Sequence, residues 1–251
     1  MPRRVDILGV PVDVVTEPDA LSFVRERIRT HTPSRVVTVN VEYVMHAYKD
    51  SAFAHVLQTA DMATPDSAGI LWAMRRQGED VSQRVGGSDL IWSLSEQASR
   101  EGHRVFLLGA AEGVAQCAAS RLQTRNPNLT VAGTWAGSPG PSERAFIVDL
   151  IRRSQTDLLF VAFGSPRQDL WIAENLLHTG ACVAIGVGGS FDYVAGTARR
   201  APAWMRDRGM EWLWRLYRQP WRWRRMMAIP RFVWRVTFGG HASSRLNKED
   251  M

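Results

Sequence analysis

Short apolar segments alternate with helix-length stretches along the first 198 residues of the chain. Most of the apolar segments end in Gly, Ser, Asn or Asp, which favour turns. Strands that alternate with helices are typical of a mainly parallel sheet covered by helices on both faces. The strand-like segments are RVDILGVPVDVV, SRVVTVNVE, ADMATPDS, HRVFLLGAA, LTVAGTWAG, TDLLFVAFGS and ACVAIGVGGSF. We therefore predict an α/β fold with a mainly parallel sheet.

At 251 residues and 45% hydrophobic composition, the chain is long enough to bury a full core. Its apolar runs are shorter than the roughly 18 residues that a membrane-spanning helix needs. The first residues are a poor signal peptide, because their apolar stretch is short and soon reaches Asp13. Cys117 and Cys182 belong to no CxxC motif or Cys/His cluster, which argues against a disulfide framework or a structural zinc site. We therefore expect a globular protein of the cytoplasm.

Positive charge is concentrated near the end of the chain. Between Arg199 and Arg235 there are eleven arginines, no lysine and two carboxylates, so this segment carries +9. Residues 236–251 are neutral and the whole chain carries +6, which leaves −3 for residues 1–198. A basic segment confined to one end predicts an anionic partner there, whether nucleic acid, a lipid head group or a phosphate. A solvated charged face is the alternative, but such faces usually mix Lys with Glu, whereas this segment is rich in Trp.

Several predicted strands end in residues suited to ligand binding, and ligands of such sheets bind beyond the carboxyl ends of the strands. Gly109 ends one strand before a helix, which would let backbone N–H groups approach a phosphate, although a tight connection is the alternative reading. In FVAFGSPRQD, Ser165 is predicted to cap a helix whose first residue is Pro166. That places Gln168 in the first turn, and Asp192 follows another glycine-rich strand end.

Asp66, in MATPDSAG, stands at the tip of a predicted strand before a predicted helix. Its carboxylate is available there as a general base, or it caps the helix, and the residue types favour neither reading. Residues 1–198 contain no DxD pair of the kind that holds Mg²⁺ against a nucleotide diphosphate. If a diphosphate is bound, arginines must neutralise its charge.

Seven segments together resemble the WecG/TagA/CpsF family of bacterial glycosyltransferases, glycosyltransferase family 26. They occur in family order between Val5 and Arg235. The segments are TVNVEYV, ADMATPDSAG, RVGGSDL, VFLLGAAEGVA, DLLFVAFGSPRQDLWI, IGVGGSFDYVAGTARRAPAW and GMEWLWRLYRQPWRWRR. The chain departs from the usual Pro-Asp-Gly, because Ser67 and Ala68 stand between Asp66 and the glycine, and it has Asp169 where the family commonly has Glu.

The resemblance implies an inverting, metal-independent transfer of a sugar from a UDP-sugar to a polyprenyl-pyrophosphate-linked glycan, without a cofactor. Family donors include UDP-N-acetylmannosamine, its uronic acid and UDP-glucose, and the products belong to bacterial cell-surface polysaccharides. The implied protein is peripheral on the inner face of the cytoplasmic membrane, and homo-oligomers are compatible with this assignment. The implied fold is a Rossmann-like catalytic domain over residues 1–198 and a helical appendage over 199–238, which closes the active site and docks on the membrane. Residues 239–251 are expected to form a flexible tail.

The resemblance also assigns roles to individual residues. Asp66 is implied as the base and Arg84 as a contact of phosphate or of the acceptor's pyrophosphate. Gln168 is implied to position the sugar, and Asp192 to accept hydrogen bonds from hydroxyls of the donor. Thr38 and Asn40 are expected to line the same pocket or merely to finish a strand. Gly109 and Gly188 are expected to allow the close approach of the nucleotide, and the arginines implied to neutralise the diphosphate are Arg215, Arg222 and Arg225.

The arginines of the last segment also follow a helical pattern. Arg215, Arg218, Arg222 and Arg225 are three, four and three residues apart, so a helix would carry them as one stripe. Pro220 is expected to divide the segment into two helices. Guanidinium groups suit a diphosphate because they bind in a bidentate manner and keep their charge. Neighbouring tryptophans favour an interfacial position at a membrane, or packing against the α/β body.

Three rival functions remain for a chain of this pattern. A protein that binds nucleic acid would use interleaved arginines and aromatic residues, but that explains neither the acidic body nor the polar strand ends. A nucleotide-binding dehydrogenase should show a GxGxxG motif, which this chain lacks. A non-catalytic membrane scaffold would bind liposomes without turnover. We expect no nucleic-acid partner and no metal site.

Overall fold

The computed structural model describes residues 2–202, 204–205, 208–218, 220 and 223–238, with the side chains of Arg215 and Arg225 excepted. Six parallel strands form the main sheet in the order β4-β3-β8-β7-β5-β6. Their bounds are β3 Ser34–Val39, β4 Met62–Pro65, β5 Arg104–Gly109, β6 Thr130–Trp135, β7 Leu158–Ala162 and β8 Val183–Gly186. The predicted α/β fold with a mainly parallel sheet is confirmed.

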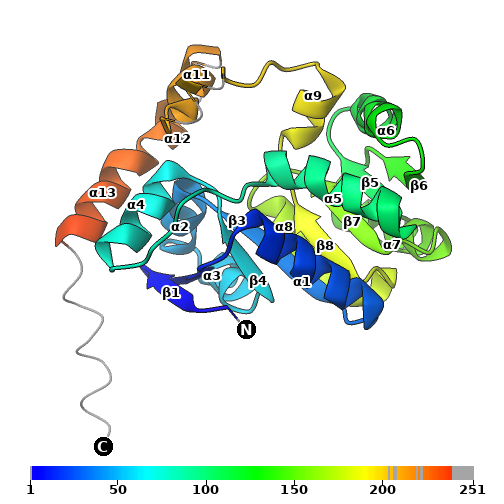
Figure 1. Cartoon of the computed structure of the whole chain (residues 1–251), viewed down its shortest axis with the longest axis horizontal. Coiled ribbons are helices and arrows are strands. Elements are labelled where there is room, and N and C mark those ends of the chain that lie inside the picture. The colour runs from blue at the N-terminus through cyan, green and yellow to red at the C-terminus, as the bar shows by residue number, and fades with distance from the viewer. Residues whose placement is uncertain (1, 203, 206–207, 219, 221–222, 239–251) are drawn as a thin grey trace, which may run out of the picture.

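Helices cover both faces of this sheet (Figure 1). One face packs against α1, α5, α6 and α9, and the other against α2, α3, α7 and α8. Neighbouring strand residues point to opposite faces, so Leu107 joins the first core and Phe106 the core under α7 and α8. The bounds are α1 Glu17–Arg29, α2 Val41–Ala47, α3 Ser51–Gln58, α4 Ala68–Arg76, α5 Gly87–Glu101, α6 Val114–Arg125, α7 Pro141–Arg153, α8 Arg167–Thr179 and α9 Ser190–Ala195.

The first strand-like segment folds as a hairpin outside the main sheet. Strands β1 (Arg4–Ile7) and β2 (Val10–Asp13) pair antiparallel with each other. Leu8 and Gly9, at φ of 54° and 86°, make the turn between them. Two consecutive positive φ angles are the requirement of a tight hairpin turn, and the glycine meets one of them without strain. The single strand suggested by the apolar run is therefore two.

In the described part of the C-terminal segment, the body is followed by α11 (Glu211–Arg218), α12 (Trp223–Met226) and α13 (Ala228–Phe238). The expected interruption near Pro220 is present, because α11 ends before it and α12 begins after it. Helix α13 packs against α2 and α4, where the fully buried Phe232 joins a core with Val41 and Ile70. No helix in the described part of the chain is long and apolar enough to cross a membrane.

Candidate active site

Asp66 lies at the carboxyl end of β4, where its backbone N–H donates to the carbonyl oxygen of Val39 at the end of β3 (2.8 Å). The cap of the following helix α4 is Ser67, whose Oγ accepts a hydrogen bond from Ile70 N at 3.3 Å. The reading of Asp66 as a helix cap is therefore wrong. Its half-buried carboxylate lies against Gly86, the N-cap residue of α5.

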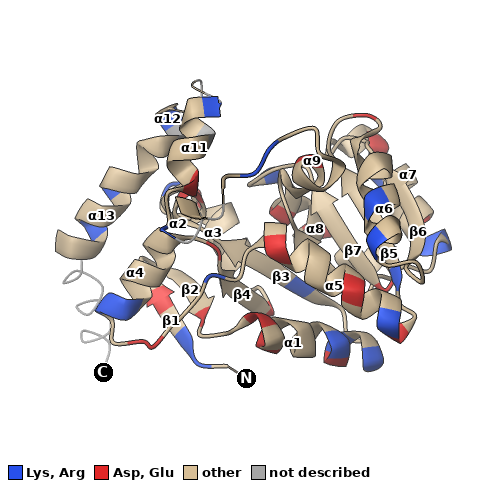
Figure 2. Cartoon of the chain, turned by 45° about the horizontal axis from the view of Figure 1, so that its top comes forward, with Lys and Arg blue, Asp and Glu red and all other residues tan. Residues whose placement is uncertain are grey.

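Arg84 and Arg200 form a charged cluster with carboxylates beside Asp66. The Arg84 guanidinium pairs with Glu211 at 2.6 Å and lies 3.8 Å from Asp89, in the first turn of α5. Arg200 binds both Asp89 oxygens, at 2.6 Å and 2.8 Å. These pairs join the N-terminus of α5 to the connection after α9 and to α11. In Figure 2 basic residues mark this connection, α12 and α13.

The charges of three carboxylates act on the Arg200 guanidinium. Burial alone would lower the pKa of this guanidinium. Its hydrogen bonds to Asp89 and the charges of Asp89, Glu211 and Asp66 nevertheless raise the pKa above its ordinary value. The cluster thus places a permanent cation in the field of the Asp66 carboxylate.

Gln168 is buried and bonded to three protein groups. Its Oε1 accepts hydrogen bonds from Gly164 N at 3.1 Å and Gly188 N at 3.0 Å, which follow β7 and β8. Its Nε2 donates to the Tyr43 hydroxyl at 3.0 Å, and that hydroxyl donates to Asp169 at 2.7 Å. The side chain therefore ties two ligand-side turns to α2. The predicted helix start is one residue early, since Pro166 is the N-cap and α8 begins at Arg167.

Burial raises the pKa of Asp169 from 3.8 to about 7, although hydrogen bonds from Tyr43 and from its own backbone partly oppose this. Burial and the Asp169 charge likewise raise the pKa of the Tyr43 hydroxyl well above its ordinary value. Tyr43 therefore remains a hydrogen-bond donor through the neutral pH range. Asp169 is the group in this network that titrates near neutrality.

Because the folded protein binds the Asp169 proton more tightly than the unfolded chain, the associated stability is complete below pH about 4. It is lost as the pH rises to about 7. We expect the Asp169→Asn variant, which resembles the protonated form, to lose less thermal stability than the wild type across this range. Thermal unfolding at pH 4 to 8 measures the difference. Parallel curves for the two proteins would contradict a raised Asp169 pKa.

Thr38 and Asn40 lie at the end of β3, next to the β4 end that carries Asp66. The Thr38 hydroxyl donates to Gly186 O at 3.4 Å and is buried within the sheet. Asn40 is the N-cap of α2, because its Oδ1 accepts from Tyr43 N at 3.1 Å. Both side chains thus have structural partners, and their predicted contact with substrate stays a prediction.

The other predicted residues follow β5 and β8. Gly109 ends β5 at φ 102°, and a Cβ atom there would lie 2.8 Å from the backbone of Ala162. Gly188 has φ 53° with open space where a Cβ would be, so its backbone can be approached closely. The half-buried Asp192, in the first turn of α9, accepts a hydrogen bond from Thr197. These residues share the carboxyl edge of the sheet with Asp66.

The side chains of the three predicted diphosphate arginines lie outside the described part of the structure. Arg222 lies outside the described residues, and Arg215 and Arg225 are described only as backbone of α11 and α12. Sequence reasoning did not single out Arg200, Asp89 or Tyr43. The motif RRAPAW was a signal for Arg200, but its partner Asp89 lies 111 residues away.

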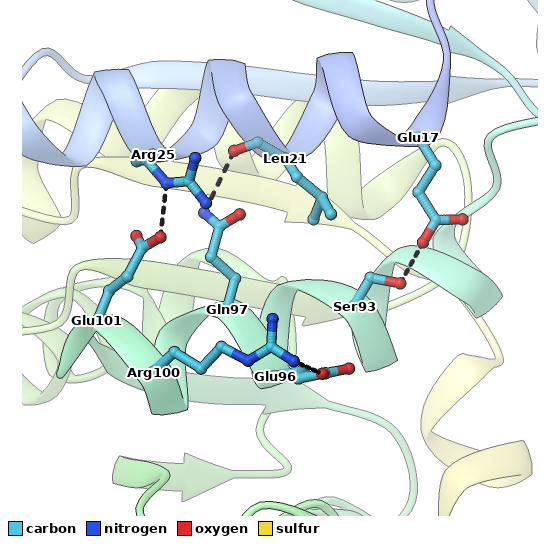
Figure 3. Close-up of a pocket in the computed structure, with 8 residues that line it drawn as sticks. All are labelled: Glu17, Leu21, Arg25, Ser93, Glu96, Gln97, Arg100 and Glu101. Atoms are coloured by element: carbon cyan, nitrogen blue, oxygen red, sulfur yellow. Dashed lines mark hydrogen bonds and ion pairs between the residues drawn. The ribbon is translucent and has the colours of Figure 1, made fainter.

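A hollow of about 250 Å³ lies between α1 and α5, away from this edge (Figure 3). Its polar and charged groups bond to one another: Arg25 to Glu101, Arg100 to Glu96, and Ser93 to Glu17. Because these groups pair with one another, the hollow is a groove between two packed helices. It contains none of the predicted site residues, so the candidate site is the carboxyl edge.

The fold places this edge where β4, β3, β8, β7 and β5 end, which is where α/β proteins of this class bind their ligands. The chain belongs to the Glycosyl transferase WecG/TagA/CpsF family, whose model matches residues 5–245. It is therefore a glycosyltransferase, and the resemblance drawn from its motifs is confirmed.

Three relatives are named N-acetylglucosaminyldiphosphoundecaprenol N-acetyl-beta-D-mannosaminyltransferase. The protein from Bacillus subtilis (strain 168) is 35% identical over 199 residues, 79% of this chain and 77% of its own. That from Bacillus spizizenii is 34% identical over 84% of this chain and 81% of its own. The protein from Staphylococcus aureus (strain MW2) is 29% identical over 93% of this chain and 92% of its own.

Proposed function

We propose that this enzyme transfers N-acetylmannosamine from its UDP derivative to N-acetylglucosamine linked through a diphosphate to a polyprenol. The names of the relatives support this acceptor and this sugar. The observation that carries the proposal is the position of the Asp66 carboxylate, which does not cap α4 and lies beside an arginine cluster at the carboxyl edge of the sheet. The product would belong to a bacterial cell-surface polysaccharide.

In the proposed inverting reaction, Asp66 accepts the proton of the acceptor hydroxyl as that oxygen attacks the anomeric carbon. The new carbon–oxygen bond forms on the face opposite the departing UDP. The bond to the diphosphate breaks, and UDP leaves with the bonding electron pair. Arg84, with Arg215, Arg222 and Arg225, would neutralise the charge that develops on the diphosphate.

The sheet edge offers a track of suitable length for an extended donor. Four strand spacings separate β4 from β5, so the Gly109 turn lies roughly 19 Å from the Asp66 strand if twist is neglected. We place the sugar near Asp66 and the nucleotide toward Gly109, with the Gly188 turn and Asp192 between them. Gln168 then acts by fixing the Gly164 and Gly188 turns, because its bonded groups already serve the protein.

We also propose that catalysis needs no metal ion, because arginines supply the positive charge that faces the diphosphate. In support of this proposal, residues 1–198 contain no DxD pair. UDP release from the donor with a polyprenyl-diphosphate acceptor should persist in EDTA. An absolute requirement for added Mg²⁺ or Mn²⁺ would contradict the proposal.

A panel of UDP-sugars, offered with lipid diphosphates that carry a mono- or disaccharide, tests the substrate assignment. UDP-N-acetylmannosamine with the N-acetylglucosamine lipid should give the fastest transfer, with inversion visible in the NMR coupling of the product. Preference for UDP-glucose or for the uronic acid would reassign the donor. The Ser67–Ala68 pair after Asp66 is the departure from the family motif nearest to the proposed base, so it is the first place to seek such a preference.

The C-terminal helices expose large apolar side chains, and we propose that they dock on the inner face of the cytoplasmic membrane. The exposed large apolar side chains in and beside these helices are Trp204, Trp212, Leu213, Tyr217, Trp223, Met227, Val233, Trp234 and Phe238. Exposed Trp interleaved with Arg suits an anionic membrane interface.

Trp234→Ala should weaken binding to phosphatidylglycerol vesicles by about tenfold, because Trp234 is 60% exposed and loses apolar area that lipid would cover. Vesicle flotation at low ionic strength measures the change. Leu177→Ala is the matched control, since Leu177 is 77% exposed but lies on α8 of the body. Equal vesicle binding by the Trp234 variant and the wild type would contradict docking through α13.

A further inference from the structure

The backbone conformation at Gly86 does not require a glycine. It is the N-cap residue of α5 with φ −107° and ψ 155°, an extended conformation that any residue adopts. A Cβ atom on Gly86 would nevertheless overlap Oδ1 of Asp66 and lie 2.8 Å from its Cγ. The Asp66 carboxylate therefore fills the space that a side chain at position 86 would need.

Two buried hydrogen bonds fix this approach. Val85 N donates to Pro65 O at 2.7 Å, and Thr64 Oγ1 donates to Val85 O at 2.7 Å. The residues just before Gly86 are thereby tied to the residues just before Asp66, so the two backbones cannot easily separate. Relief of a clash would have to come from the Asp66 side chain.

The other neighbours restrict where α5 itself can move. A Cβ atom on Gly87 would lie 3.2 Å from Val187 Cα, so the start of α5 also packs closely against the residue that follows β8. Two residues further on, Asp89 is held by both nitrogens of Arg200. The start of α5 is thus also held by contacts other than the one with Asp66.

We infer that Gly86 is a positioning residue for the catalytic base: its missing side chain lets the Asp66 carboxylate lie against the N-terminus of α5. The inference rests on the proposed role of Asp66 and deepens it. A methyl group at position 86 would rotate the carboxylate away from this place. Displacement of a reacting group by about 1 Å costs on the order of a hundredfold in rate.

Gly86→Ala should therefore lower kcat by about a hundredfold while the KM for the UDP-sugar changes little. Gly140→Ala is the matched control. Gly140 is also an extended N-cap glycine without a side-chain cap bond, but the nearest atom to its Cβ position is the Ser138 hydroxyl at 3.4 Å. The control should keep kcat within about twofold, since it reproduces the change of cap residue without the clash.

A thermal-unfolding cycle tests the contact independently of activity. Gly86→Ala should lower Tm more than Gly140→Ala does, and the excess should vanish when Asp66→Ala removes the carboxylate. If Gly86→Ala fails to fold, folding of the double variant Asp66→Ala/Gly86→Ala supports the inference. Failure of the double variant to fold, or an excess that persists in it, overturns the inference.

The kinetic outcomes separate this inference from the proposed function. Loss of kcat in Asp66→Asn with wild-type kcat in Gly86→Ala would overturn the positioning role alone. Wild-type activity in Asp66→Asn would instead refute Asp66 as the base, whatever the unfolding cycle shows. A rise in the KM of Gly86→Ala with unchanged kcat would also overturn positioning of the base, because it would place the effect in substrate binding.

Discussion

Replacement of Asp66 by Asn is expected to lower kcat by two to four orders of magnitude, the usual contribution of general base catalysis. Asn has nearly the same volume and can still lie against Gly86, so packing at the start of α5 should survive. Ser67 keeps the cap of α4 in both proteins. The variant therefore keeps the shape of the side chain and removes the proton acceptor, together with one negative charge near Arg200. Steady-state release of UDP with the lipid acceptor measures the effect.

Asp80→Asn, at an exposed loop residue, is the control for loss of one negative charge and should leave kcat within about twofold. Circular dichroism and Tm should show both variants folded. Transfer by Asp66→Asn at the wild-type rate would exclude Asp66 as the base. Loss of transfer only through a raised KM would move Asp66 to substrate binding.

The sheet was predictable because its strands are short apolar runs with turn residues at their ends. The hairpin of β1 and β2 was less visible. Its turn uses Leu8 and Gly9 in place of the Asn-Gly or Asp-Gly pair that marks such turns, and the flanking residues are apolar on both sides. An unbroken apolar run was therefore the natural reading.

The role of Asp66 as cap or base could not be decided from residue types, because Asp and Ser are both good caps and stand side by side. The choice depends on which side chain faces the first turn of α4, and that is Ser67. Gly86 was invisible for a similar reason. Its importance comes from an approach of two backbones that are 20 residues apart in the chain.

The charged cluster depends on still longer separations. Arg84 meets Glu211 across 127 residues, and Arg200 meets Asp89 across 111. Each residue alone is one charge among many, and only the folded chain selects its partner. The resemblance to the family indicated Arg84, because family motifs reflect tertiary contacts that local secondary-structure propensity does not.

Helix α13 shares a core with the body, which bears on the proposed division at residue 198. Phe232 is fully buried between α2 and α4, and a Cβ atom on Gly69 would lie 3.8 Å from its ring. Gly69 is three residues from Asp66. Truncation after Trp204 should therefore abolish transfer, but it also exposes this apolar core. A single substitution separates the loss of transfer from the exposure of this core better than the truncation does.

Phe232→Ala should weaken the docking of α13 by about 3 to 5 kcal/mol, the usual cost of removing a buried phenylalanine ring. Hydrogen exchange should show faster exchange in α13 and in the first turn of α4, while β5 and β7 stay protected. Phe238→Ala, in the same helix but 71% exposed, should change stability by about 0.5 kcal/mol or less in the absence of lipid. We expect transfer to fall with the docked fraction, because the proposed arginine clamp reaches the diphosphate only when the C-terminal helices lie against the body. Full transfer by Phe232→Ala with α13 exchanging freely would show that catalysis does not need these helices.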